Sequence, residues 1–170
     1  MINLKKCGVV IVNHVDGIFK SPIGDLVVNV TEKGVSGISF SDEPEMCEAK
    51  GSAILTACLA QLAEYFDGVR AEFSVPLDLK GTPFQLSAWR ALLQIPYGST
   101  ASYGGIAAAI GRPKAVRAVG GANHNNPVSI IVPCHRVIGS DGSLTGYGGG
   151  LHRKQWLLDH EAKYSKRSRK

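Results

Sequence analysis

The stretch SYGGIAAAIGRPKAVRAVGGANHNNP, residues 102–127, contains two short helical patterns separated by a tight turn. The first pattern, residues 102–110, is rich in alanine. Gly111 is suited to close it, and Pro113 is suited to open a second helix. Two short helices joined by a tight turn are typical of a helix-turn-helix. The stretch therefore predicts that the second half of the chain is mainly helical.

The two faces of the second helix differ in character. Ala115, Val116 and Val119 recur at helical spacing, so we expect them to face the core. The opposite face carries basic and small residues: Lys114, Arg117, Gly121 and His124. Gly120 and Gly121 each cost about 1 kcal/mol relative to alanine inside a helix. They indicate close helix–helix packing or an early helix end, or else close approach to a nucleic-acid backbone, and this segment alone favours neither reading.

Charge is unevenly distributed along the 170 residues. Residues 1–84 carry 7 Lys and Arg against 11 Asp and Glu, residues 85–160 carry 7 against 2, and residues 161–170 carry 5 against 1. The two halves therefore differ in sign, which indicates that the second half meets a polyanion. The basic end, residues 164–170, is expected to be a disordered tail.

The composition is that of a soluble globular protein, with 44% hydrophobic and 19% charged residues. The longest apolar run near the N-terminus, residues 8–12, is too short to span a membrane. The four cysteines lack the CxxC spacing of a zinc site, and their positions suggest no disulfide framework, so a reduced intracellular compartment fits best. Cys58 lies in a helical pattern and is expected in the core, whereas the pattern assigns no role to Cys7 or Cys47.

The first half of the chain alternates short apolar segments with turns. We expect strands at residues 8–15, 24–30 and 34–40, with turns at residues 21–24 and 32–34. A helix over residues 52–66 should follow, closed by Asp67 and Gly68, and Thr82-Pro83 should start another helix through Gln94. We place the domain boundary near Gly81, which gives an N-terminal α/β domain at 1–80, a C-terminal domain at 81–163 and the tail at 164–170.

The stretch SIIVPCHRVIG, residues 129–139, places a thiol and an imidazole directly after an apolar run. Residues 130–132 are β-branched and predict a short buried strand that Pro133 ends. Cys134 in a basic neighbourhood suits an activated nucleophile. A Cys-His pair is more often a structural cysteine beside a surface histidine, because strand neighbours face opposite ways, but the break at Pro133 weakens that alternative. A metal site is disfavoured because Cys134 and His135 have no further ligands nearby in sequence.

The last helical pattern, LHRKQWLLDHE at residues 151–161, offers a carboxylate for this imidazole. Leu151, Leu158 and Ala162 are expected to mark its buried stripe, with Glu161 at the edge. A charge in that position needs a partner, and His135 would complete a Glu–His–Cys relay. The alternative is a solvated residue at a fraying helix end.

Together these residues resemble the methylated-DNA–protein-cysteine methyltransferases, or O6-alkylguanine-DNA alkyltransferases. Three segments resemble the active domain of that family: VRAVGGANHNNPVSIIVPCHRVIGSDGSLTGYGGGLHRKQWLLDHE, IPYGSTASYGGIA and GTPFQLSAW. The segment SPIGDLVV and the helix ending in YFDG resemble its N-terminal domain, particularly in the bacterial branch, so the likeness spans about residues 15 to 162. It implies an α+β fold, with a small ribonuclease-H-like α/β N-terminal domain and a mainly helical C-terminal domain that contains a winged helix-turn-helix.

The resemblance also implies a reaction and its catalytic groups. The protein would repair double-stranded DNA by a single-turnover transfer of the alkyl group from O6-alkylguanine, and from O4-alkylthymine, to its own Cys134. His135 would hold a water that deprotonates the thiol, Glu161 would orient His135, and Asn126 would stabilise the turn beside the site. The displacement needs a thiolate and a protonated leaving group, and the base must leave the duplex to reach the thiol.

Further roles follow from the same resemblance. Tyr103 would assist rotation of the nucleotide and donate a proton to the departing guanine. The carbonyls of Cys134 and Val137 would read the guanine amino group, and Tyr147 would line the pocket. Gly148 stands where some relatives have serine, so only its backbone N–H is available to the guanine oxygen. The DNA-binding residues would be Arg117, which replaces the extruded nucleotide, together with Lys114, Ala118, Gly120 and Gly121.

The resemblance implies no cofactor, and the zinc-binding pattern of some animal members is absent from the N-terminal half, so we expect no metal. We expect a monomer with no membrane attachment, in the cytoplasm or, in a eukaryote, the nucleus. The small residues of TGYGGG, residues 145–150, suggest a pocket open to alkyl groups larger than methyl. Two alternatives are kept: a lesion-binding relative without catalysis, which Cys134 disfavours, and a Cys-His hydrolase, for which no oxyanion-hole motif is evident.

Overall fold

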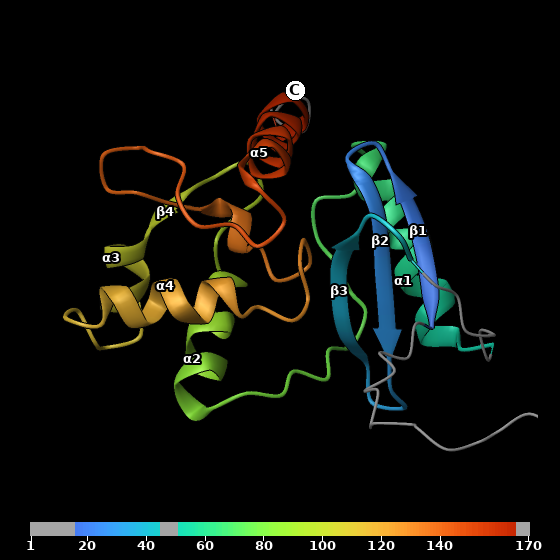
Figure 1. Cartoon of the computed structure of the whole chain (residues 1–170), viewed down its shortest axis with the longest axis horizontal. Helices are drawn as coiled ribbons and strands as arrows, with labels where there is room; N and C mark the ends of the chain where they lie inside the picture. Colours follow the sequence, from blue (N-terminus) through green and yellow to red (C-terminus); the bar gives the residue numbers. More distant parts are fainter. Residues whose placement is uncertain (1–15, 45–50, 166–170) are drawn as a thin grey trace, which may run out of the picture.

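The computed structural model describes residues 16–44 and 51–165. Two groups of elements lie side by side, a small sheet with one helix and a cluster of helices, and the last helix lies between their upper ends (Figure 1). The first group comprises β1 (Gly17–Ser21), β2 (Gly24–Val30), β3 (Val35–Ser41) and α1 (Ala53–Phe66). The second comprises α2 (Pro83–Leu92), β4 (Ala101–Ser102), α3 (Tyr103–Ala109), α4 (Val116–His124), the 3-10 turn η1 (Cys134–Arg136), β5 (Val137–Ile138) and α5 (Leu151–Ser165).

The N-terminal sheet is antiparallel, with strand order β1-β2-β3, and α1 packs against it. The β1–β2 hairpin turns at Pro22 and Ile23, and Gly24 has a φ of 117°, which favours glycine. Leu26 and Val28 alternate along β2 and are fully buried. The helix predicted at residues 52–66 is α1, and Ser52 caps it by accepting a hydrogen bond from the backbone N–H of Leu55.

The strands were predicted only in part. The segments at 24–30 and 34–40 correspond to β2 and β3, and the predicted strand at residues 8–15 lies outside the described residues. β1, with the sequence GIFKS, was missed because it is short and carries no strong alternation of apolar side chains. Its identity as a strand depends on pairing with β2, which a local pattern does not reveal.

The C-terminal helices begin largely where their caps predict. Thr82 and Gln85 form a capping box at the start of α2, and Ser102 caps α3. Pro113, however, does not open α4. It lies in a turn closed by a 2.8 Å hydrogen bond from the Ala115 N–H to the Arg112 carbonyl, and the helix begins only at Val116.

The apolar run at residues 130–132 is a turn, and the prediction of a strand is wrong. Ile130 has a φ of 73°, in the left-handed region that β-branched residues rarely adopt. The Val132 N–H donates to the Val128 carbonyl at 3.0 Å, which closes the turn. Ile130 and Val132 are fully buried, so their apolar character reflects burial in the core and not a strand backbone.

A short backbone junction attaches this turn to the N-terminal sheet. The Ile38 N–H donates to the Pro127 carbonyl at 2.8 Å, and the Ser129 N–H donates to the Ile38 carbonyl at 3.0 Å. The outer edge of β3 therefore carries the chain that leads into η1 (Figure 1).

None of the helices among residues 16–44 and 51–165 is long and apolar enough to cross a membrane.

The last helix differs from its prediction at both its end and its buried face. α5 continues through Ser165, so residues 164 and 165 are helical and not part of a disordered tail. Leu151 is 49% exposed and Ala162 is exposed, whereas Leu157 is fully buried. The buried face carries mainly polar residues: Lys154, His160 and Glu161 beside Leu157. The predicted stripe is wrong because the inward face packs on a polar network, described next.

Candidate active site

Cys134 begins the η1 turn and lies almost completely buried, with 3% of its surface exposed. Its side chain lines a pocket of about 360 Å³. The other lining residues come from β3, α4, the turn before η1 and the loop before α5, and include Phe40, Asn123, Asn126, Tyr147, Gly148 and Gly149. The pocket thus brings together residues from both halves of the chain around a single thiol.

The surroundings of the thiol favour its protonated form at rest. Burial raises the pKa of Cys134, while a hydrogen bond with Asn126 and the charge of Lys154 lower it in part. Because the net shift is upward, the thiol needs a base to become a thiolate. The nearest candidate in sequence is His135.

His135 and Glu161 form the pair that the sequence predicts. Nε2 of His135 lies 2.8 Å from Oε1 of Glu161, and both side chains are fully buried. Burial lowers the pKa of His135, and the nearby cations lower it further, although the hydrogen bond and charge of Glu161 oppose this shift. Burial alone would raise the pKa of Glu161, but its bonds to His135 and Arg136 hold it well below its ordinary value.

These shifts define the protonation state of the pair. Glu161 is a carboxylate, so the facing nitrogen, Nε2, carries a proton and donates to it, and the lowered pKa of His135 leaves the ring otherwise neutral. Nδ1 of His135 is then the unprotonated nitrogen of the ring. It is buried and has no hydrogen-bond partner among the described residues. The imidazole therefore presents a free basic nitrogen in the core, directly after Cys134.

Glu161 is not at the edge of an apolar face, as predicted, but at the centre of a buried network. Arg136 donates to both of its oxygens, from Nε and Nη2, each at 2.9 Å. The hydroxyl of Tyr65, from α1, donates to Oε1 at 2.8 Å, and the backbone N–H of Gly98 donates to Oε2 at 2.9 Å. With His135, five donors hold the carboxylate, which fixes both its position and its charge.

Asn126 forms two hydrogen bonds with the backbone of the turn that precedes Cys134. Its Nδ2 donates to the Val132 carbonyl at 2.8 Å, and its Oδ1 accepts from the Val128 N–H at 3.1 Å. Asn123, in α4, donates to the carbonyl of Cys134 at 3.3 Å. The side chain of Asn126 therefore holds the turn whose left-handed residue, Ile130, would otherwise be strained.

Lys154 is a component that the sequence reasoning missed. Its fully buried ammonium donates to the carbonyls of Val137, at 2.6 Å, and Thr145, at 2.7 Å. Burial lowers the pKa of Lys154, and the charge of the Cys134 thiolate opposes this shift. The spacing of positions 154, 157 and 161, three and then four residues apart, is the signal that would have placed it on the inward face.

The predicted substrate residues surround the same region. The hydroxyl of Tyr103 donates to the Thr145 carbonyl at 3.0 Å, and Val137 is fully buried. Tyr147 is buried, and its hydroxyl has no partner among the described residues. At Gly148, an added Cβ would meet only the His124 carbonyl, at 3.8 Å, so this residue faces the C-terminal end of α4.

The outer face of α4 is exposed at Arg117 and Gly121, as predicted, and at Ala118, while Lys114 is also exposed but lies in the turn before the helix. An added Cβ at Gly120 or Gly121 would meet nothing within 4 Å, and the helix continues to His124. Neither close helix packing nor an early helix end therefore explains the two glycines.

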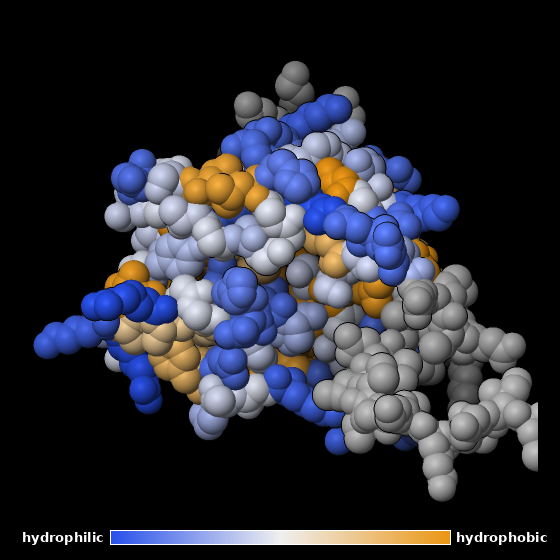
Figure 2. All heavy atoms as spheres, viewed as in Figure 1, coloured by the Kyte–Doolittle hydropathy of each residue, from blue (hydrophilic) through white to orange (hydrophobic). Residues whose placement is uncertain are grey.

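The buried side of α4 differs from its prediction in two residues, since Ala115 precedes the helix and is only half-buried. Val116 is 40% exposed because it is the first residue of the helix, while Val119 and Ala122 carry the buried side. Figure 2 shows strongly hydrophilic side chains projecting from the end of the molecule formed by α3, α4 and their turn.

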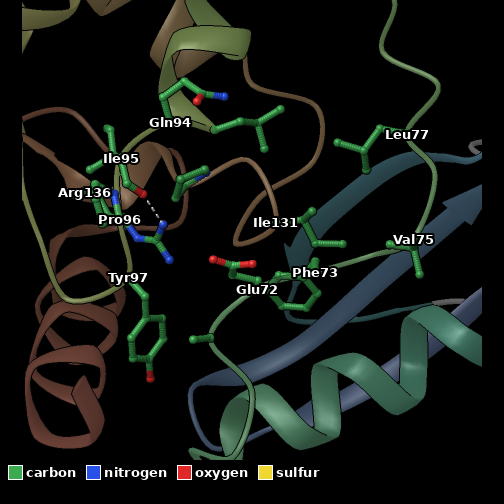
Figure 3. Close-up of a pocket in the computed structure, with 13 residues that line it drawn as sticks. Glu72, Phe73, Val75, Leu77, Gln94, Ile95, Pro96, Tyr97, Ile131 and Arg136 are labelled. Carbon is green, nitrogen blue, oxygen red and sulfur yellow. Dashed lines mark hydrogen bonds between the residues drawn. The ribbon is translucent and has the colours of Figure 1, made fainter. Parts of the chain in front are cut away.

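A second cleft, of about 510 Å³, is lined by Arg136 and does not include Cys134. Arg136 and Tyr97 lie on one side of it, with Val75 and Leu77 on the other (Figure 3). The dashed line in Figure 3 marks the 2.6 Å bond from Nη1 of Arg136 to the carbonyl of Ile95. With Nε and Nη2 bound to Glu161, this guanidinium is committed to the fold and not to a ligand.

The part of the chain that the structure describes contains no candidate metal site and one cysteine besides Cys134. Within residues 16–44 and 51–165, no group of three or more His, Cys, Asp and Glu residues is placed to hold a metal ion. Cys58 is a free, buried thiol in the core, as predicted, and burial raises its pKa to about 11. Cys7 and Cys47 lie outside the described residues.

The fold and the site define a two-domain protein in which a ribonuclease-like domain abuts a helical domain that carries a buried thiol and a helix-turn-helix. Residues 15–79 match the family model of the 6-O-methylguanine DNA methyltransferase ribonuclease-like domain, and residues 83–163 match that of its DNA-binding domain. The chain therefore belongs to the 6-O-methylguanine DNA methyltransferase family.

Named relatives agree with this assignment. The methylated-DNA–protein-cysteine methyltransferase of Mycolicibacterium paratuberculosis is 48% identical over 149 residues, which cover 85% of this chain and 90% of the relative. The constitutive enzyme of Bacillus subtilis is 47% identical over 151 residues, covering 84% and 92%. The crystal structure of Mycobacterium tuberculosis OGT in complex with DNA is 47% identical with a TM-score of 0.79, covering 86% of this chain and 92% of that one.

Proposed function

We propose that Cys134 is the alkyl acceptor of this DNA-repair methyltransferase. Members of the family carry the alkyl group of O6-methylguanine in DNA to one of their own cysteines, and this protein does the same. The observation that carries the assignment is the arrangement of three buried groups. The Cys134 thiol lines a pocket. The next residue, His135, has a neutral imidazole whose Nε2–H donates to the Glu161 carboxylate.

The reaction is a displacement at the alkyl carbon. The proton of the Cys134 thiol passes, through one water, to the bare Nδ1 of His135. The thiolate then forms the new carbon–sulfur bond as the bond between the alkyl carbon and O6 of guanine breaks. Glu161 stabilises the imidazolium that results, and a proton supplied to the departing guanine completes the balance. Tyr103, which bridges to the loop before α5, is the proposed donor of that proton.

Arg136 acts on this reaction indirectly, through Glu161. Its two bonds keep Glu161 ionised in the core, so the Nε2–H tautomer of His135 is the one that the fold selects. Lys154 supports the developing thiolate by its charge and fixes the Val137 carbonyl, which is proposed to read the guanine amino group.

The α4 face is proposed to enter the minor groove of DNA. Gly121 is exposed and Gly120 is half-buried, and an added Cβ at either would meet nothing inside the protein, so the helix backbone is accessible to a close partner. Arg117 and Lys114 supply positive charge beside them, and Arg117 would take the place of the nucleotide that leaves the stack. The base would then reach the pocket through the gap between α4 and the Tyr147–Gly149 loop.

The remaining expectations extend this proposal. We propose O4-alkylthymine as a second substrate, a monomer as the active form and the cytoplasm as its location. Bacterial relatives support the last of these. The family models end at residue 79 and resume at residue 83, which supports a domain boundary near Gly81.

The acceptor assignment is tested by Cys134→Ser with Cys58→Ser as the matched control. Each variant is mixed with a duplex that contains O6-methylguanine, and the masses of its tryptic peptides are measured by mass spectrometry. We expect a methyl group on the Cys134 peptide in wild type and in Cys58→Ser, and no protein methylation in Cys134→Ser, with duplex binding retained. Methylation of any other cysteine would overturn the assignment.

A further inference from the structure

The N-terminal domain contributes a wall to the pocket that holds Cys134. Three residues at the end of β3 and just beyond it line this pocket: Ser39, Phe40 and Asp42. Phe40 is the large apolar member of the three, and its ring is half-buried. The pocket is therefore not a property of the helical domain alone.

Arg153, in α5, connects this wall to the loop on the other side of the pocket. Its guanidinium lies over the Phe40 ring, 4.5 Å from the centroid, and Nη2 pairs with Asp42 at 3.1 Å. Nε donates to the Ile23 carbonyl at 2.8 Å, and Nη1 donates to the Gly149 carbonyl at 3.1 Å. One side chain thus holds the β1–β2 turn, the Phe40 ring and the pocket loop in a fixed relation.

Gly149 allows Phe40 to come close to the pocket tyrosine. A Cβ added at this glycine would lie 2.7 Å from Cε1 of Tyr147 and 2.8 Å from Cδ2 of Phe40. Both distances are too short for any side chain, so the two rings already fill the space that a larger residue would take. The glycine therefore serves close packing of Phe40 against the loop, and it does not leave open room beside the thiol.

We propose that Phe40 is a specificity-determining residue that limits the size of the alkyl group transferred to Cys134. The inference rests on the proposed acceptor role of Cys134. A methyl group needs little space beyond the reacting carbon, whereas a benzyl group adds a ring that the pocket must accommodate, and Phe40 is a bulky apolar part of the pocket wall. A wall of this kind discriminates between substrates by their fit in the transition state.

The test compares Phe40→Ala with Phe19→Ala. Phe19 belongs to the same sheet but stacks on Phe66, away from the pocket, so it matches the change in volume without opening the wall. Single-turnover rates are measured on duplexes that carry O6-methylguanine or O6-benzylguanine, and thermal melts confirm that each variant is folded. The quantity compared is the ratio of the benzyl rate to the methyl rate.

We expect Phe40→Ala to raise this ratio by roughly tenfold, the scale of discrimination by a pocket that differs by a few apolar atoms, and Phe19→Ala to leave it unchanged. An unchanged ratio in Phe40→Ala would overturn the proposal, and so would a fall, which would make Phe40 a stacking partner for the larger group. Failure of the proposed function is distinguishable, because it would leave no methylated Cys134 in wild type.

A second variant tests the part of the proposal that concerns Arg153. Arg153→Gln frees Phe40 from its cation–π contact, and free O6-benzylguanine base serves as substrate so that DNA affinity plays no part. We expect faster reaction with the free base in Arg153→Gln, and no further gain when Phe40→Ala is already present, since the two act on one wall. Equal gains in both backgrounds would show that Arg153 does not act through Phe40.

Discussion

Replacing Glu161 with glutamine should damage both stability and transfer, for reasons that the buried network specifies. Glutamine keeps the shape of the side chain but removes its charge, which leaves the guanidinium of Arg136, only 6% exposed, without a counter-charge. Leaving a buried partner unpaired costs about 3–5 kcal/mol. In glutamine an NH2 group also replaces one of the two carboxylate oxygens. This group donates hydrogen bonds, so it repels the donors that converge on that oxygen in the wild type.

The pH dependence gives the sharper part of this prediction. The pKa of Glu161 is lower in the folded protein than in the unfolded chain, where it is about 4.3. The contribution of Glu161 to the free energy of unfolding is therefore fully present above this unfolded pKa and is lost as the pH falls through the folded pKa. The difference in unfolding free energy between wild type and Glu161→Gln should therefore shrink below about pH 4.3, by up to about 1.4 kcal/mol per pH unit.

The assay is urea unfolding of wild type and Glu161→Gln across this range, with single-turnover transfer measured at neutral pH. Glu64→Gln is the matched control, because Glu64 also pairs with an arginine, Arg70, but at the surface. We expect the control to change stability by less than about 1 kcal/mol and Glu161→Gln to slow transfer by roughly a hundredfold or more. A stability difference that stays constant as the pH falls would refute the assignment of Glu161 as a buried carboxylate.

Three further changes test the DNA face and the proton donor. Arg117→Ala should slow repair of duplex DNA far more than reaction with the free alkylated base, since only the duplex requires extrusion; equal losses would remove Arg117 from that role. Gly121→Ala should stabilise the fold by up to about 1 kcal/mol, because its Cβ meets nothing inside the protein, yet weaken duplex binding in an anisotropy titration; unchanged affinity would contradict close approach of DNA. Tyr103→Phe should slow transfer without weakening DNA binding, and an unchanged rate would mean that another group protonates guanine.

The sequence predicted the reacting pair better than the network around it. Cys134 and His135 are adjacent, and Glu161 was predicted as the partner of His135 because a charge at the edge of an apolar helix face needs a counter-group, although the edge position itself was wrong. Tyr65 and Glu161, by contrast, are 96 residues apart, and no local pattern indicates that a tyrosine of α1 would donate to a carboxylate of α5. The role of Arg153 was hidden in the same way, because its partners Ile23, Phe40 and Asp42 belong to the other domain.

Local propensity also led to one wrong element and one wrong face. The β-branched run at 130–132 predicted a strand, but the bond between Val132 and Val128 and the side chain of Asn126 hold it as a turn. The α5 stripe was predicted from leucine positions, whereas ion pairing and backbone carbonyls select Lys154 and Glu161 for the interior. Specific hydrogen bonds decided both cases, local ones in the turn and long-range ones in α5, and periodicity encodes neither.

The most direct test of the account is the stoichiometry of transfer. A thioether at Cys134 has no electrophilic carbonyl for water to attack, and His135 and Glu161 move a proton but offer no route for the alkyl group to leave. Excess duplex containing O6-methylguanine is mixed with a known amount of protein, and repaired guanine and methylated Cys134 are counted over time. We predict that both rise together to one equivalent and stop. Continued release of repaired guanine beyond one equivalent, with unmodified Cys134 recovered, would contradict the mechanism.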